Sequence, residues 1–112
     1  MSACYEPSEA NEPNLFTQFD TTAQGVYLLA YSGLLVAHLP PAKLSAKSAE
    51  ELTLIYVTHT VVINGSNLVN LMEIIRGGRA KRIFVGGEPS GGKFPVAKTI
   101  FVTEGVKSEK AL

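Results

Sequence analysis

Short apolar runs, separated by glycine, proline and polar residues, follow one another along this chain. Residues 52–57 and 60–63 are rich in β-branched and aromatic side chains, which is the composition of β-strands. The two residues between them either link two strands or lie within one long strand. Residues 81–85 and 96–103 are a further pair of such runs. Runs of this length between turn-forming residues predict that the second half of the chain is mainly β.

The longest apolar stretch, residues 26–39, is divided near its middle by Ser32 and Gly33. Two apolar runs on either side of a Ser-Gly pair indicate a β-hairpin with both faces largely covered. A single buried helix is the alternative, because leucine and alanine favour helices and periodicity alone does not separate the two. Gly33 favours the hairpin. The stretch is shorter than the roughly 20 residues that a membrane-spanning helix needs, so no membrane association is expected.

The apolar residues of the segment 67–76 recur with the period of an α-helix. This segment lies between two polar or glycine-rich segments. Apolar side chains recur there at positions i, i+3, i+4 and i+7, namely Leu68, Leu71, Met72 and Ile75. Ser66 is suited to cap the first turn, and Gly77 with Gly78 is suited to end the last turn. The pattern predicts one short amphipathic helix.

These elements together predict a small, mainly β fold: a five-stranded, partly open barrel with one short helix. An α+β sheet with one helix is the alternative. The 112 residues fit one domain. We expect residues 1–24 to form an acidic extended arm, residues 25–106 the single barrel domain, and residues 107–112 a charged tail.

Charge is divided unevenly along a chain whose formal net charge is zero. Residues 1–42 hold four acids and no base, whereas residues 43–112 hold ten bases and six acids, so the two parts carry −4 and +4. Most of the basic excess lies within residues 76–98 and includes Arg76, Arg79, Lys81, Arg82, Lys93 and Lys98. Basic side chains beside flexible glycines are suited to phosphate contacts. A solvated basic face at a helix C-terminus is the alternative.

Few residues are arranged as catalytic or metal-binding groups would be. Cys4 is the single cysteine, which excludes an internal disulfide and a cysteine-based zinc site. His38 and His59 lack metal-ligand spacing, and His59 has no acidic residue close in sequence. Residues 87–93 match the spacing of a phosphate-binding P-loop, but Phe94 stands where the magnesium-binding hydroxyl should be. We therefore expect no catalytic residue, no metal, no cofactor and no enzyme activity.

The N-terminal residues contain no base and no apolar run, so no secretory signal is expected there. The protein is expected to be cytoplasmic. The tripeptide Asn64-Gly65-Ser66 matches a glycosylation sequon, but without secretion we interpret it as a turn.

Three strings resemble parts of the Sm/LSm family, whose members are small five-stranded barrels that form rings and bind RNA. Residues 66–69, Ser-Asn-Leu-Val, resemble the Met-Asn-Leu string of the family's first motif. Residues 75–78, Ile-Arg-Gly-Gly, resemble the Ile-Arg-Gly string of its second motif, and residues 26–33 resemble its opening strand and glycine turn. The chain is also similar, more loosely, to divergent Sm-like proteins of marine phage type.

The resemblance implies a Sm/SH3-like barrel in which Asn67 contacts a base and Arg76 and Gly77 line an RNA pocket. Further phosphate contacts are expected from the basic cluster, namely Arg79, Lys81 and Arg82. Tyrosine or histidine side chains would serve as stacking surfaces. The expected function is that of a homo-oligomeric module that binds RNA or single-stranded DNA. The alternative is a structural or protein-interaction subunit without nucleic-acid binding.

Overall fold

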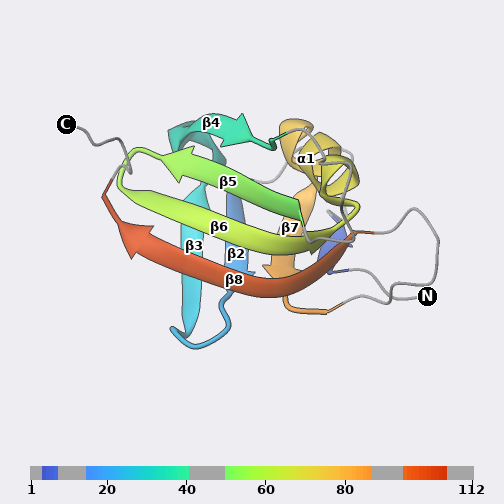
Figure 1. The fold of residues 1–112 in the computed structure, drawn as a ribbon. Coiled ribbons are helices and arrows are strands. Elements are labelled where there is room, and N and C mark those ends of the chain that lie inside the picture. The colour runs from blue at the N-terminus through green and yellow to red at the C-terminus, as the bar shows by residue number, and fades with distance from the viewer. Residues whose placement is uncertain (1–3, 8–14, 41–49, 87–94, 106–112) are drawn as a thin grey trace.

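The computed structural model describes residues 4–7, 15–40, 50–86 and 95–105. Eight strands, one α-helix and one 3₁₀ turn are found in these ranges (Figure 1). They follow the chain as β1 (Tyr5–Pro7), β2 (Phe16–Asp20), β3 (Val26–Ala30), η1 (Tyr31–Gly33), β4 (Leu34–His38), β5 (Glu50–Tyr56), β6 (His59–Ser66), α1 (Leu68–Arg76), β7 (Ala80–Phe84) and β8 (Val96–Glu104).

The strands form two four-stranded sheets. The first has the order β1-β7-β2-β3 and the second the order β4-β5-β6-β8. Only the β2–β7 pair among them is parallel. In Figure 1 the strands of the second sheet cross in front of those of the first at a steep angle. This is the arrangement of two sheets packed face to face with their strands crossed.

The core lies between the two sheets and continues under the helix. Phe19 and Ile83 from the first sheet are fully buried, as are Leu54 and Ile63 from the second. Burial alternates along β5, where residues 52, 54 and 56 point inward, as expected for a strand with one covered face. The helix adds Leu68, Leu71 and Ile75 to the same core.

The mainly β fold with one short helix is confirmed. The described strands number eight and lie in two sheets, instead of the five strands of a Sm-like barrel, and they form no closed barrel. Part of the difference comes from the segment expected to be an acidic arm. Residues 5–7 and 16–20 of that segment are β1 and β2, which pair with β7 in the first sheet.

Residues 26–39 form two strands and no α-helix, but the expected hairpin is wrong. The strand β3 pairs with β2 and β4 pairs with β5, so the two strands belong to different sheets. The 3₁₀ turn η1 between them carries the chain from one sheet to the other. Both strands are sheet edges and they expose several large side chains. The exposed fractions are 63% for Val26, 61% for Leu28, 59% for Leu35 and 47% for Val36.

The helix begins one residue later than expected and is not capped by Ser66. Asn67 precedes the first helical residue with a left-handed φ of 56°, and its side chain makes no capping bond. The Leu68 amide instead donates a hydrogen bond of 2.8 Å to Oε1 of Glu50. A carboxylate at this end of a helix also interacts favourably with the helix dipole.

The end of the helix agrees with the expected glycine stop. Gly78 has a φ of 68°, its amide donates to the carbonyl oxygen of Ile75 at 2.9 Å, and the Arg79 amide donates to that of Ile74 at 3.1 Å. These bonds are those of a Schellman motif, which requires a left-handed residue at the position of Gly78.

Asn64 and Gly65 do not form the expected turn, because β6 continues through them to Ser66. Gly65 lies opposite Ala97 at an irregularity of the β6–β8 pairing. A Cβ atom at Gly65 would overlap the carbonyl oxygen of Val96. The glycine therefore allows a close approach of two backbones within the sheet.

The P-loop-like residues 87–93 and the expected charged tail, residues 107–112, lie outside the described residues. No helix in the described ranges is long and apolar enough to cross a membrane.

Candidate functional site

Three of the predicted nucleic-acid-binding residues lie at the end of α1: Arg76 is its last residue, Gly77 caps it, and Arg79 follows after Gly78. Lys81 and Arg82 belong to the next strand, β7. Asn67 lies at the opposite end of the nine-residue helix, about 13 Å away along its axis at 1.5 Å per residue.

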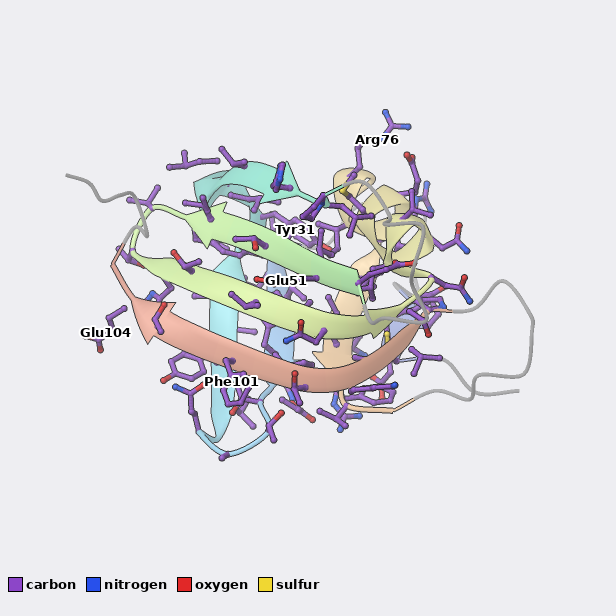
Figure 2. The ribbon with its side chains drawn as sticks, in the orientation of Figure 1. Tyr31, Glu51, Arg76, Phe101 and Glu104 are labelled. Atoms are coloured by element: carbon purple, nitrogen blue, oxygen red, sulfur yellow. The ribbon has the colours of Figure 1, made fainter. Side chains whose placement is uncertain are left out.

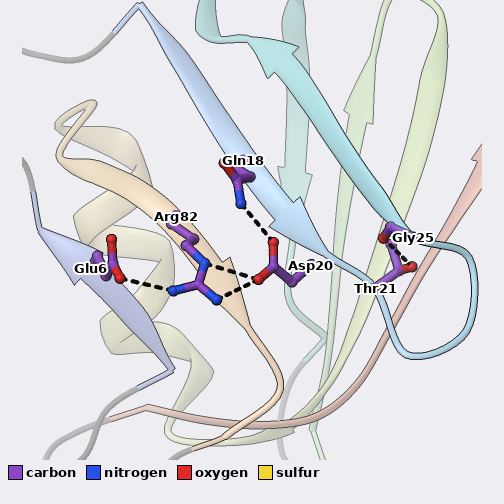
Figure 3. A network of polar contacts seen from close by, with 6 residues as sticks. All are labelled: Glu6, Gln18, Asp20, Thr21, Gly25 and Arg82. Carbon is purple, nitrogen blue, oxygen red and sulfur yellow. Dashed lines mark hydrogen bonds and ion pairs between the residues drawn. The ribbon is translucent and has the colours of Figure 1, made fainter.

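Arg82 is the centre of a polar network that joins three neighbouring strands (Figure 3). Its Nε and Nη2 atoms donate to Oδ2 of Asp20 at 2.9 and 2.6 Å, and its Nη1 atom donates to Oε2 of Glu6 at 2.8 Å. Gln18 donates a further bond of 2.9 Å to Oδ1 of Asp20. A phosphate group at Arg82 would have to displace two carboxylates.

The network shifts the pKa values of Asp20 and Arg82. Partial burial disfavours the charged form of Asp20, but the hydrogen bonds from Gln18 and Arg82 and the charge of Arg82 outweigh it and lower the pKa of Asp20. The hydrogen bonds to Asp20 and Glu6 raise the pKa of Arg82 further. The Arg82 guanidinium also lies 4.7 Å from the centroid of the Phe84 ring. The network is therefore charged at neutral pH.

The other members of the basic cluster are on the surface. Arg76 forms an ion pair of 2.8 Å with Glu73, and its side chain is 77% exposed. Figure 2 shows this side chain projecting from the end of α1 away from the body of the molecule. Arg79 and Lys81 are also exposed. Since Arg76 and Arg82 both pair with carboxylates, the cluster carries less free positive charge than its sequence indicates.

An apolar surface lies on the outer face of the first sheet, and we call its residues Phe16, Val26 and Leu28 the β3 patch. Leu28 lies opposite Gln18 and Val26 lies opposite Asp20 in the β2–β3 pairing. The patch therefore borders the Arg82 network. All three side chains are exposed.

A groove of about 290 Å³ separates β4 from α1. We call it the β4–α1 groove. Its lining consists of Leu34, Leu35, Val36 and Ala37 from β4 and of Met72, Ile75 and Arg76 from α1. Alternate residues of a strand point to opposite faces. A groove lined by four consecutive strand residues therefore runs along the edge of β4.

The two edges of the second sheet differ in how they are covered. At the β8 edge, Gln24 donates to the Val102 carbonyl at 2.6 Å and accepts from the Val102 amide at 2.8 Å. Thr22 makes an equivalent pair of bonds with Ile100, at 3.0 and 2.9 Å. The loop between β2 and β3 thus replaces a neighbouring strand. Within the described ranges, no strand pairs with the outer edge of β4.

The histidines and the cysteine lie apart from each other. His59 shares a hydrogen bond of 2.7 Å with Thr58 and packs edge-on against Tyr27. His38 is exposed on β4. Cys4 is fully buried, and burial raises the pKa of its thiol to about 11. Among the described residues, no group of three or more histidine, cysteine, aspartate or glutamate side chains could hold a metal ion.

The sequence did not indicate the β3 patch or the β4–α1 groove. Both arise because an apolar run that was expected to be covered lies at two sheet edges. The role of Gln24 was also missed, since its partner Val102 is distant in sequence.

No protein-family model, no curated protein and no solved structure matches this chain. The surfaces described above are therefore the basis for a functional proposal.

Proposed function

We propose that the protein is a protein-interaction subunit that assembles with further copies of itself through the β3 patch. The observation that carries this proposal is the position of residues 26–39. This apolar run, the longest in the chain, forms two edge strands and leaves Val26 and Leu28 more than half exposed. Exposed apolar side chains on an open edge are a liability in a monomer, and a second chain would cover them.

A second copy is a suitable partner for this surface. In a two-fold dimer the same patch faces itself, so apolar side chains meet apolar side chains. Complete burial of a leucine or valine side chain contributes about 1.5–3 kcal/mol. The adjacent Arg82 is already neutralised by Glu6 and Asp20, so no strong field of one sign opposes a copy.

Self-association should depend on Leu28. The change Leu28→Lys is expected to weaken it by about tenfold or more, because each copy would bring a charge into an apolar contact. Sedimentation velocity from about 1 to about 100 µM measures the effect through mass action. The control is Val57→Lys, which changes an exposed valine outside the patch. A wild-type protein that remains a 12.0 kDa monomer throughout would contradict the proposal.

The exposed bases after α1 support a second proposal, binding of RNA or single-stranded DNA. Arg79 lies beside Gly77, and Lys81 follows in β7. Cationic side chains and backbone amides are both suited to phosphate contacts. The support is weaker than for self-association, since Arg76 and Arg82 pair with carboxylates.

Salt dependence tests this second proposal. The logarithm of the affinity for a labelled oligouridylate should fall linearly with the logarithm of the salt concentration, and the change Arg79→Ala should reduce the slope by about 1. The change Arg82→Gln should leave the slope unchanged, because Glu6 and Asp20 already hold this guanidinium. Absence of retention at low salt would exclude nucleic-acid binding.

A further inference from the structure

We infer that the β4–α1 groove binds one extended segment of a partner protein by strand addition, with apolar side chains directed into the groove and a carboxylate placed at Arg76. This site is separate from the β3 patch and does not depend on self-association.

The first argument is the backbone at the edge of β4. This strand ends the second sheet, so its outer N–H and C=O groups have no strand beside them among the described residues. The opposite edge of the same sheet is covered by Thr22 and Gln24. An open edge of this kind pairs with an extended chain, whose main-chain hydrogen bonds provide affinity.

The second argument is the wall opposite that edge. Met72 and Ile75 of α1 face β4 across the groove. A strand added beside β4 would direct its alternate side chains into this apolar groove. The volume of about 290 Å³ is just below the range for small-molecule pockets, about 300–1,000 Å³, so it would take one or two side chains of the bound segment.

Charge distinguishes a partner segment from a second copy of β4. The strand β4 contains no carboxylate, so a second copy that paired with it would bring none from this strand to Arg76. The occupant that fits is therefore an extended segment of another protein that carries an acidic residue.

The third argument is charge. Among the described residues that line the groove, Arg76 is the only one with an acidic or basic side chain, and β4 contains no aspartate, glutamate, lysine or arginine. Its present partner Glu73 lies on the exposed side of α1, and exposed ion pairs contribute little. A carboxylate of the bound segment can replace Glu73 and form a charge-assisted hydrogen bond with the guanidinium.

The probe is a phage library of random dodecapeptides, selected on the wild-type protein and depleted on Leu35→Lys, a change at the lip of the groove. The expected consensus is an alternation of apolar and polar residues with an acidic residue at one end. The most enriched peptide is then synthesised, and its affinity is measured by fluorescence anisotropy. Amide hydrogen exchange of residues 34–37 then shows whether the bound peptide lies along β4.

Binding should slow exchange along β4, whose edge amides become hydrogen-bonded. The change Arg76→Gln should weaken binding about tenfold, by loss of a charge-assisted bond, and Glu73→Gln should strengthen it about twofold, by removal of a competing carboxylate. Lys98→Gln, an exposed cation of β8, is the matched control and should have no effect.

Three results would overturn the inference: no enriched peptide, protection of β4 amides in the free protein at every concentration, or protection that increases with protein concentration alone. The second result would assign the groove to another part of this chain, and the third to a second copy. Loss of self-association in Leu28→Lys is measured separately, so either proposal can fail while the other holds.

Discussion

Two tyrosines in the core differ in how their hydroxyl groups are paired. The Tyr31 hydroxyl donates to the Ala80 carbonyl at 3.0 Å and accepts from the Ala80 amide at 3.1 Å. The Tyr56 hydroxyl is buried without a hydrogen-bond partner among the described residues, and burial raises the pKa of Tyr56. A buried polar group without a partner destabilises the folded state, whereas a paired group does not.

Removal of each hydroxyl should therefore have opposite effects. We expect Tyr56→Phe to leave the free energy of unfolding unchanged or to raise it by about 1 kcal/mol, because a desolvated hydroxyl is lost. Tyr31→Phe should lower it by about 1 kcal/mol, since two bonds to Ala80 are lost. Urea denaturation of the two variants and the wild type measures both. A loss of stability in Tyr56→Phe equal to that in Tyr31→Phe would contradict this expectation.

At the scale of residues, features that depend on neighbours in the sequence could be predicted, whereas contacts with residues distant in the sequence could not. The glycine stop after α1 depends on Gly77 and Gly78 alone, and it was predicted. The start of α1 depends on Glu50, which bonds the Leu68 amide and lies far from it in sequence. The prediction that Ser66 caps the helix was therefore wrong. Gly65 was expected in a turn because nothing nearby in sequence indicates the approach of Val96.

At the scale of elements, the loop between β2 and β3 covers the edge of β8. Its residues Thr22 and Gln24 bond to alternate residues of β8, as a neighbouring strand would. Covered edges resist pairing with other chains. The loop therefore closes one side of the second sheet.

The change Gln24→Ala should open this edge. Two bonds to Val102 would be lost, so exchange of the Val102 amide should increase by about 30-fold, with each bond worth about 1 kcal/mol. Hydrogen exchange followed by NMR measures it. The Ile100 amide, held by Thr22, serves as an internal reference. An unchanged rate at Val102 would show that Gln24 does not cover the edge.

Most strands could be located from composition, but their pairing could not. The runs at 52–57, 60–63, 81–85 and 96–103 correspond to β5, β6, β7 and β8 within a few residues. The hairpin expected at 26–39 failed because the partners of both strands are other strands. Two consecutive runs with a Ser-Gly pair between them have the same pattern whether they pair with each other or pass between sheets.

At the scale of the whole molecule, the acidic and basic parts of the chain meet at Arg82. Glu6 and Asp20 belong to the acidic part, and they hold Arg82 of the basic part through three hydrogen bonds. The zero net charge is thus partly an internal neutralisation. It reduces the basic surface on which the predicted RNA site depends.

This neutralisation should give stability a specific dependence on pH. The pKa of Asp20 is lower in the folded state than its ordinary value, so its contribution is fully present above about pH 4 and is lost as the pH falls through the folded pKa. We expect Asp20→Asn to be less stable than the wild type at neutral pH, and the difference to vanish in acid. Urea denaturation at several pH values measures this.

Glu51→Gln, which removes an exposed carboxylate of the other sheet, is the control for the loss of one negative charge. A difference between Asp20→Asn and the wild type that stays constant down to about pH 2 would contradict the linkage.

Arg76, Gly77 and Arg79 lie together at the end of α1 because they are close in sequence. The availability of Arg82 could not be predicted, since Glu6 and Asp20 reach it from other strands. The β3 patch and the β4–α1 groove were missed for the same reason. Exposure depends on which strands become edges, and the pairing of the whole chain determines that.

The pairing of β1 with β7 has a consequence for synthesis on the ribosome. Tyr5 lies opposite Ile83, so the first sheet cannot be completed until β7 has been made. Contacts this distant in sequence slow folding, and chains are synthesised at only about 5–20 residues per second. For several seconds the nascent chain would therefore present β2, β3 and β4 without β7. A chaperone acting on this protein during translation would meet the apolar residues of β2, β3 and β4 before β7 is made.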